Sequence, residues 1–435
     1  MRQLLFLSAE SQKSLRYLVQ WILISIIAGA TGTAILAGFM FLYSIIKDVI
    51  SSLEIIAIPI LAAFAGLLVG FVIYRIEPHA SGEGVPSYLK SLRHHDGRLS
   101  FSESFYKFWA ALFTLSFYGN GGFVGPLGRI SAGVMSRLGK LFHKLGMNEY
   151  HIRTCTICGF ASVTGALFYC PIGGGLFAVE IIQKANMRYR DLFPAILSSS
   201  MAVLTARTFS FGPIIQITAI ETELNINLLW LFILIAVCTG IIGRLYIYLY
   251  ARVAGIFKRA EMKSMGIKAA AGMLLATVPL IAINPNLLGV SIDIFNSLLS
   301  HSTIHLYGAL PTWLPLAAVL VILLVLKAFA SAVTTGSGLS AGITGPAILL
   351  GMLVGAFFAE LFGIAPLSGD YFTLIAAGFA GMLSSIMNVP IAASVITIEI
   401  FGLWYGLPAG LASVISFQIN RHNMIYDLAL AEDNE

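Results

Sequence analysis

Long stretches without any charged residue dominate this sequence of 435 residues. They cover residues 17–46, 55–74, 110–128, 154–179, 224–243, 269–292, 306–326, 328–359 and 371–398. A helix that spans a bilayer needs about 20 apolar residues, and most of these stretches are at least that long. Several are longer and contain Gly and Pro, which predicts that they hold two tilted or half-length helices.

The composition excludes a soluble protein. Only 11% of the residues are charged, against roughly 25% in soluble domains. Hydrophobic residues make up 58%, which also excludes a disordered chain. In a bilayer the backbone must satisfy its own hydrogen bonds, and long unbroken apolar runs favour helices over the short alternating strands of a barrel. The predicted fold class is therefore an all-α integral membrane protein with many tilted and broken transmembrane helices.

The charged residues indicate orientation rather than a binding surface. The net charge of +5 is scattered at the ends of segments, so nucleic-acid binding is not expected. Basic residues occur in the N-terminal segment and in residues 90–98, and the positive-inside rule places both on the cytoplasmic side. No cleavable signal peptide is predicted. We expect a multi-pass protein of a bacterial cytoplasmic membrane.

Three short motifs place glycines directly before a proline and an apolar run. They are GEGVP (82–86), GGFVGP (121–126) and GITGP (342–346). Glycine permits irregular backbone and proline is favoured in the first helical turn, so each motif predicts a helix N-terminus. Such an end presents unpaired amides and a partial positive charge, which favours an anion. Several ends that converge at mid-membrane would form a selective anion site.

The chain also has the character of a two-fold repeat. GGFVGP lies in the first half and GITGP in the second, and each is followed by a proline, small residues and a glutamate, in PIGGGLFAVE (171–180) and PIAASVITIE (390–399). This correspondence predicts two membrane repeats of inverted topology with a site between them. The expected division is a cytoplasmic segment at 1–16, a first repeat at 17–210 and a second repeat with a short tail at 211–435, without a separate soluble domain.

With these motifs in this order, the sequence resembles the CLC family of chloride channels and chloride/proton exchangers over about residues 17–426. GEGVP is similar to the family's GSGIP, GFVGP to its G(K/R)EGP and GITGP to its GxFxP. The resemblance implies a homodimer with one anion pathway in each subunit. It further implies a central chloride or other small anion near Glu83, Gly84, Val124 and Gly125. Backbone amides of the third motif would hold this anion and a C-terminal tyrosine would close the site; the matching residues here are Ile343, Thr344 and Tyr426. No metal and no other cofactor is expected.

Two departures from the family pattern bear on mechanism. Val124 stands where the family has a glutamate that gates the pathway and carries protons. Ile181, next to Glu180, stands at the internal glutamate of the exchangers. An aliphatic side chain can neither act as a charged plug nor bind a proton. We therefore predict passive, channel-like anion conduction. The alternative is a proton-coupled exchanger that uses Glu83 as a relocated acid.

Glu83 itself occupies the position of the family's anion-contacting serine. A carboxylate about 4 Å from a bound anion is repelled by roughly 4 kcal/mol at an effective dielectric constant near 20. Three arrangements remain open. The carboxyl group is protonated and donates a hydrogen bond; it is a tethered anion that blocks the pathway; or it turns away toward a cation such as Lys90 or Arg93.

Other polar residues in the apolar runs have structural explanations. Glu180 and Glu399 are expected to pair with basic residues or backbone amides. The alternative for both is a role in transport, and Glu180, an acid directly before Ile181, is a candidate for the proton pathway. Lys327 is expected at a membrane boundary or beside an acid, and Arg129 is expected to raise the positive potential near the second motif. Thr344, at the family's phenylalanine position, adds a hydroxyl that could touch the anion; Thr is also common at helix starts.

Other classes of function find little support. Cys155 and Cys158 form a CxxC, but zinc needs four ligands and no partner pair is evident, so packing is expected. Ser337 could suggest an intramembrane serine protease, which needs a nearby histidine. None of the eight histidines lies in the middle of a long apolar run, so an enzyme is not expected. A non-transporting membrane protein stays as a remote alternative.

Overall fold

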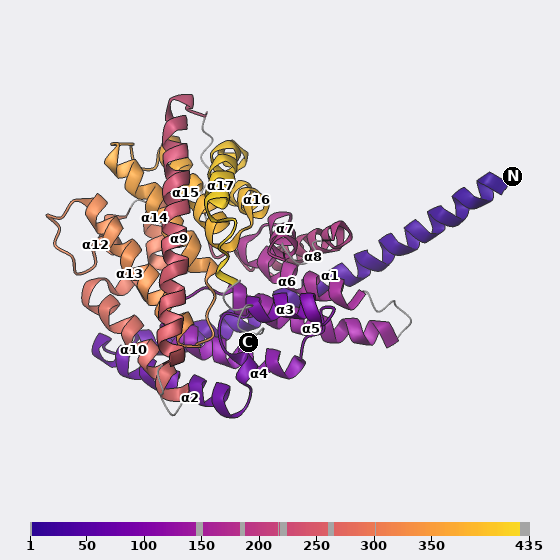
Figure 1. Ribbon diagram of the computed structural model, residues 1–435, viewed down its shortest axis with the longest axis horizontal. Coiled ribbons are helices and arrows are strands. Elements are labelled where there is room, and N and C mark those ends of the chain that lie inside the picture. Colours follow the sequence, from indigo (N-terminus) through magenta and orange to yellow (C-terminus); the bar gives the residue numbers. More distant parts are fainter. Residues whose placement is uncertain are drawn as a thin grey trace.

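The computed structural model describes residues 2–144, 151–182, 188–215, 217, 224–259, 265–300 and 302–426. Within these ranges the secondary structure is helical apart from one β-bridge, which confirms the predicted all-α class. Helices of the first half (indigo to magenta) lie beside those of the second half (orange to yellow), and α1 extends outward to the N-terminus (Figure 1). The predicted tail after Tyr426 lies outside the described residues.

The first half contains α1 (Arg2–Ser51), η1 (Ile55–Ala57), α2 (Ile58–Arg75), η2 (Pro78–Ala80), α3 (Val85–His94), α4 (Phe101–Ser116), α5 (Val124–Lys144), α6 (His151–Phe168), α7 (Gly173–Glu180) and α8 (Tyr189–Thr208). The second half contains η4 (Ile226–Leu228), α9 (Leu229–Arg259), α10 (Met265–Ile283), η5 (Pro285–Leu287), α11 (Ile292–Ser300), α12 (Thr303–Tyr307), α13 (Leu316–Gly336), α14 (Thr344–Leu361), α15 (Gly369–Met387), α16 (Pro390–Phe401), η6 (Leu403–Tyr405) and α17 (Gly406–Asn420).

Seven helical segments in the described part of the chain are long and apolar enough to cross a bilayer. They are Ser14–Ser51, Ile55–Arg75, Ile226–Arg259, Gly266–Ile283, Leu316–Gly336, Thr344–Leu361 and Gly369–Met387. Two other apolar runs are broken as the glycines and prolines predicted. The run 110–128 divides between α4 and α5, and the run 154–179 divides between α6 and α7. The chain is a multi-pass membrane protein with helices that begin inside its apolar interior.

The breaks repeat between the two halves. Tyr169 directly follows α6 with φ at 57°, and Asn388 directly follows α15 with φ at 58°. Left-handed backbone of this kind ends helices. In both halves a proline stands two residues later, at Pro171 and Pro390, and a new helix follows. The same local chemistry therefore redirects the chain at matching positions of the two halves.

A short backbone bridge joins the second and third motifs. The amide of Gly122 donates to the carbonyl of Gly342 at 2.7 Å, and the amide of Gly342 donates to the carbonyl of Gly122 at 2.8 Å. These two glycines hold the same place in GFVGP and GITGP. A two-fold axis between the halves brings equivalent residues together in this antiparallel manner. The bridge sets the first turns of α5 and α14 side by side.

Each half of the chain contributes one membrane glutamate whose carboxylate binds backbone amides of the other half. Glu180, at the end of α7, accepts hydrogen bonds from the amides of Ile391 and Ala392 at 3.0 and 2.6 Å. Glu399, near the end of α16, accepts from the amides of Ile172 and Gly173 at 2.9 and 2.8 Å. Each carboxylate thus satisfies unpaired amides at the start of the other helix. This is the structural role expected for both; the boundary near residue 210 stays a prediction.

We expect Glu399→Ala and Glu180→Ala each to lower the free energy of unfolding by roughly 2–4 kcal/mol, because each leaves two amides at the start of a helix without an acceptor. Glu399→Gln, which keeps one acceptor oxygen, should lose less. Thermal unfolding of the protein in detergent micelles measures these losses. Exposed Glu54 supplies the matched control, Glu54→Ala. Equal unfolding temperatures for the control and the Glu180 and Glu399 variants would show that the exchanged caps contribute nothing.

The prediction for Lys327 is wrong. The residue lies inside the span of α13, is fully buried, and donates to the carbonyl of Gly289 and the hydroxyl of Ser291, each at 2.7 Å, and to the Asn120 side chain. Neutral oxygens therefore stabilise this ammonium away from any membrane boundary.

For the cysteines, the structure agrees with the predicted role in packing. Cys155 and Cys158 are free and buried in a cluster with Trp21, Ile24, Ala28 and Met135.

Candidate anion-binding site

The first turns of α3, α5 and α14 meet around Glu83. Gly84, the residue before α3, has φ at 104°, and a Cβ there would lie 3.1 Å from the carbonyl oxygen of Gly125. A Cβ on Gly125 would lie 2.7 Å from Cγ of Glu83. The two glycines therefore permit a backbone approach that any side chain would prevent. The third helix contributes Ile343, the residue before α14, whose amide faces the Glu83 carboxylate.

The Glu83 carboxylate lies at the N-terminus of α14. Its side chain is buried, with the residue 4% exposed, and its Oε1 accepts a hydrogen bond from the Ile343 amide at 2.9 Å. Its Oε2 is buried and has no hydrogen-bond partner among the described residues. Of the three arrangements open from the sequence, the structure excludes a side chain turned toward Lys90 or Arg93. The carboxylate takes the place where unpaired amides would receive an anion.

Tyr426 closes the opposite side of this carboxylate. Its hydroxyl donates to Oε1 of Glu83 at 3.0 Å and lies 2.9 Å from the sulfur of Met387. The segment after α17 brings Tyr426 against Glu83, which directly precedes Gly84 at the start of α3. The hydroxyl and the Ile343 amide thus converge on one oxygen. These are the two kinds of donor that the family resemblance assigns to a central anion.

Glu83 lies in the segment between α2 and α3, outside the seven spans. Burial raises the pKa of Glu83 to about 7, while the hydrogen bonds from Ile343 and Tyr426 and the charge of Lys107 act to lower it. The carboxyl group is therefore largely protonated below about pH 7 and largely ionised above it. It is the only residue of the first motif that can carry a proton.

An open cavity leads to Glu83 from one side. Besides the first motif, it is lined by residues of η2, α3, α9 and the end of α13: Pro78, His79, Ser81, Ser87, Lys90, Tyr250, Ala254, Thr335, Gly336 and Gly338. Hydroxyl groups, an ammonium group and a histidine contribute polar groups to a lining that is otherwise largely apolar. Glu83 therefore lies at the wall of a cavity that is open on one side.

Val124 and Thr344, at equivalent places of the two motifs, differ in chemistry. Val124 begins α5, is buried, and lines a small apolar cavity with residues that include Phe123, Leu167 and Phe295. Thr344 begins α14 and is 1% exposed, and its hydroxyl has no hydrogen-bond partner among the described residues. Thr344 therefore keeps an unused hydrogen-bonding group beside the Ile343 amide.

Lys107, which no motif in the sequence singles out, holds the first motif in place. Its fully buried ammonium donates to the carbonyls of Ala80, Ser81 and Gly82 at 3.2, 3.1 and 2.8 Å. These are the three residues directly before Glu83. The only sign in the sequence was a lysine three residues ahead of an apolar run, which gave no indication of its partners.

Arg129, which was expected to raise the positive potential near the second motif, is paired with an acid. Its guanidinium donates to the hydroxyls of Ser87 and Ser104 at 2.8 and 2.9 Å and forms an ion pair with Glu103. Its charge is therefore balanced, and its role is to connect α3, α4 and α5.

The remaining predicted residues lie elsewhere. Glu180 caps α16 as described, and Ile181 directly after it is fully buried and apolar. The Ser337 hydroxyl donates to the Thr334 carbonyl at 2.9 Å and lies close to Gly272. Among the described residues no histidine is hydrogen-bonded to it. The contacts of Ser337 are those of a packing residue at the end of α13.

Comparison with known proteins agrees with this architecture. A family model described as "Voltage gated chloride channel" matches residues 65–421. An uncharacterised protein of Methanocaldococcus jannaschii is 27% identical over 416 residues, which are 94% of this chain and 95% of the relative.

Two solved structures share the fold. A CLC-type fluoride/proton antiporter superposes with a TM-score of 0.77 at 20% identity, covering 94% of this chain and 96% of its own. A slow cyanobacterial Cl⁻/H⁺ antiporter superposes with a TM-score of 0.78 at 17% identity, covering 96% and 98%. The length of the family match, which runs from α2 through the end of α17, shows that this chain belongs to the voltage-gated chloride channel (CLC) family of anion channels and transporters.

Proposed function

We propose that this protein conducts a small inorganic anion, chloride first among the candidates, through a central site whose occupancy Glu83 controls. The observation that carries the proposal is the position of Oε1 of Glu83, 2.9 Å from the Ile343 amide and 3.0 Å from the Tyr426 hydroxyl. These donors suit a bound anion, and the carboxylate of the protein itself now uses them.

Two negative charges cannot share this place. At about 4 Å their repulsion is roughly 4 kcal/mol at an effective dielectric constant near 20, which is about a thousandfold in affinity. An anion therefore binds only when Glu83 is protonated or has moved away. Since the open cavity reaches Glu83, the pH on that side sets the fraction of protonated Glu83.

Val124 and Ile181 favour passive conduction over exchange. Strict coupling of anion transport to proton transport needs groups that carry protons between the two sides of the membrane. The two positions where the family resemblance expects such groups hold buried aliphatic side chains. Glu83 then acts as a proton-sensitive gate reached from one cavity. The second candidate, a proton-coupled exchanger, is favoured by one observation, the location of the acidic Glu83 at the anion position itself.

The transported anion is a separate part of the proposal. One structural neighbour is titled a fluoride/proton antiporter and another a Cl⁻/H⁺ antiporter. In this chain the unpaired Thr344 hydroxyl adds a donor beside the Ile343 amide. We therefore propose chloride as the first anion to test and fluoride as the second.

Purified protein in liposomes tests this function with a chloride electrode and a pH electrode. With a Glu83 pKa of about 7, protonation falls from about 90% at pH 6 to about 10% at pH 8. We expect chloride efflux to be about tenfold faster at pH 6 than at pH 8, without pumped protons. In Glu83→Gln the efflux should be fast at both pH values. Glu54→Gln, an exposed acid, is the matched control.

Other results would decide against this mechanism. Chloride efflux that pumps protons, with the pumping lost in Glu83→Gln, would establish the exchanger. Efflux that is independent of pH in the wild type would remove Glu83 as the gate. Repeating the measurement with fluoride identifies the preferred anion.

We further propose that the protein forms a homodimer in a bacterial cytoplasmic membrane. The family resemblance supports the dimer, and exposed apolar residues on α16, η6 and α17, including Ile391, Leu403 and Leu407, are compatible with it. Cross-linking in native membranes measures the oligomeric state.

A further inference from the structure

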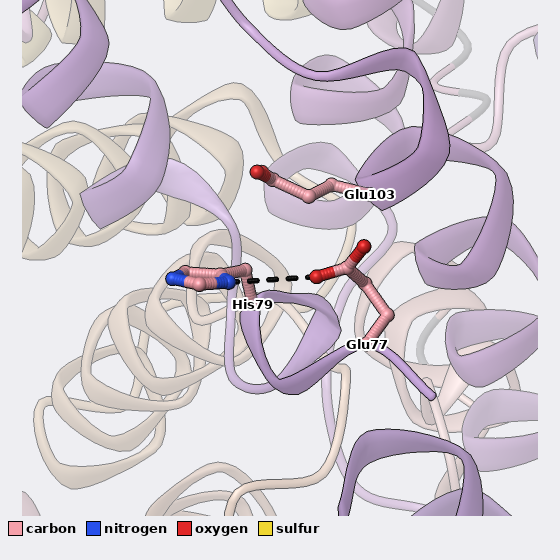
Figure 2. A group of neighbouring side chains, drawn as sticks. All are labelled: Glu77, His79 and Glu103. Atoms are coloured by element: carbon pink, nitrogen blue, oxygen red, sulfur yellow. Dashed lines mark ion pairs between the residues drawn. The ribbon is translucent and has the colours of Figure 1, made fainter. Parts of the chain in front are cut away.

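Three potential metal ligands meet at η2 and α4, and one of them, His79, lines the cavity that leads to Glu83. Glu77 directly precedes η2, His79 lies within it, and Glu103 lies in the first turn of α4. One ligand atom from each side chain lies within 4.8 Å of the others. Figure 2 shows the three side chains directed toward one region from these two elements. We propose that Glu77, His79 and Glu103 bind a divalent cation of the zinc class at the mouth of this cavity.

The spacing of the ligand atoms fits such an ion. Zinc–ligand bonds of 2.0–2.2 Å in tetrahedral geometry place neighbouring ligand atoms about 3.3–3.5 Å apart. Nδ1 of His79 and Oε1 of Glu77 are already 3.4 Å apart. Glu103 needs a side-chain shift of at most about 1.5 Å. Three protein ligands then leave a fourth position for water.

The chemistry of the donors selects the class of cation. One imidazole with two carboxylates suits zinc and related transition metals, whereas Mg²⁺ and Ca²⁺ prefer oxygen ligands alone. The His79 side chain is 75% exposed, and those of Glu77 and Glu103 are 17% and 23% exposed. An ion can therefore enter from water, and the side chains can adjust. Arg129 pairs with Oε2 of Glu103, and a carboxylate has a second oxygen for a metal.

An ion at this place would connect the two elements that position Glu83. Glu103 and Lys107 are one helical turn apart on the same face of α4. Lys107 holds residues 80–82, which lie between η2 and Glu83. A metal that joins η2 to α4 therefore restrains the segment that must move when Glu83 leaves the central site. Bound metal should slow anion conduction.

Cobalt(II) provides a direct probe of the site. We would titrate untagged full-length protein in detergent with Co²⁺, record its visible absorption, and displace it with Zn²⁺. We expect the intense spectrum of tetrahedral cobalt, and binding weakened by more than about tenfold in His79→Ala and in Glu77→Gln. His94→Ala, an exposed histidine on α3, should bind as the wild type does. Absence of the tetrahedral spectrum, or equal binding by all variants, overturns the proposal.

The effect on conduction is measured separately and rests on the proposed function. In liposomes, Zn²⁺ on the cavity side should slow chloride efflux by at least about twofold in the wild type and leave His79→Ala unaffected. Cobalt binding without any effect on efflux would overturn the link to Glu83. If no protein conducts chloride, the proposed function fails, whereas the cobalt spectrum still decides whether the site exists.

Discussion

Glu83→Ser is expected to bind chloride at the central site at least about tenfold more tightly than the wild type at pH 8, because only about 10% of the wild-type Glu83 is then protonated and able to admit the anion. The wild-type carboxylate is then mostly ionised, and its repulsion of a neighbouring anion is about 4 kcal/mol at a distance near 4 Å. The substitution removes the charge and the atoms that now contact the Ile343 amide. Glu83→Gln removes only the charge and should give a smaller gain. Isothermal titration calorimetry of the detergent-solubilised proteins measures the chloride dissociation constants.

The pH dependence of the chloride affinity tests whether the Glu83 carboxylate competes with the anion. Since the pKa of Glu83 is raised to about 7, wild-type affinity should fall as the pH rises through that value, and the affinity of the two variants should not. Glu54→Gln controls for the loss of an acid at an exposed position. If wild-type protein binds chloride as tightly as Glu83→Ser at pH 8, the carboxylate does not compete with the anion.

Gly342→Ala should remove most of the anion conduction and lower the free energy of unfolding by roughly 2–5 kcal/mol. A Cβ on Gly342 would lie 2.7 Å from the carbonyl oxygen of Gly122 and 3.1 Å from the amide nitrogen of Gly125. The two backbone segments joined by the bridge would have to separate, and both hydrogen bonds between Gly122 and Gly342 would be lost. Because α5 and α14 begin at this bridge, their N-termini would move apart and Ile343 would move away from Glu83.

Thermal unfolding in detergent and chloride efflux from liposomes measure the two effects. Gly38→Ala in α1 is the matched control, since a Cβ there meets nothing within 4 Å. Gly122→Ala, at the other residue of the bridge, should behave like Gly342→Ala, because its Cβ would lie 2.7 Å from the Gly345 amide nitrogen. A Gly342→Ala protein with wild-type stability and efflux would show that the bridge does not position the site.

Local patterns in the chain predicted the helices and their interruptions. Apolar runs predict membrane spans because each charged residue placed in a bilayer raises the free energy by its own amount. This contribution can be read from the sequence without knowing which residues pack nearby. Glycine and proline predict the starts of α5 and α14 because their backbone preferences are also local. The equivalence of GFVGP and GITGP predicted the two-fold relation that the bridge between Gly122 and Gly342 displays.

The polar contacts at the site could not be predicted in this way. Glu83 accepts hydrogen bonds from Ile343, which lies 260 positions later in the chain, and from Tyr426, which lies 343 positions later. Lys107 gave no sign that it would hold the segment before Glu83. Lys327 was expected at a membrane boundary or beside an acid, although it is buried among neutral oxygens. In each case a charged side chain inside an apolar structure is stabilised by whichever groups the fold brings to it.

The sequence alone therefore determined that this chain is a membrane protein of CLC type with irregular helix starts in its interior, because hydropathy and backbone preference belong to single residues and short runs. Only the tertiary structure decided that Glu83 accepts hydrogen bonds from Ile343 and Tyr426. It also decided that Glu180 caps α16 and Glu399 caps α7, and that Glu77 and His79 meet Glu103. The free energy of a buried charge depends on its distances to donors and counter-charges, and those distances exist only once distant segments have packed together.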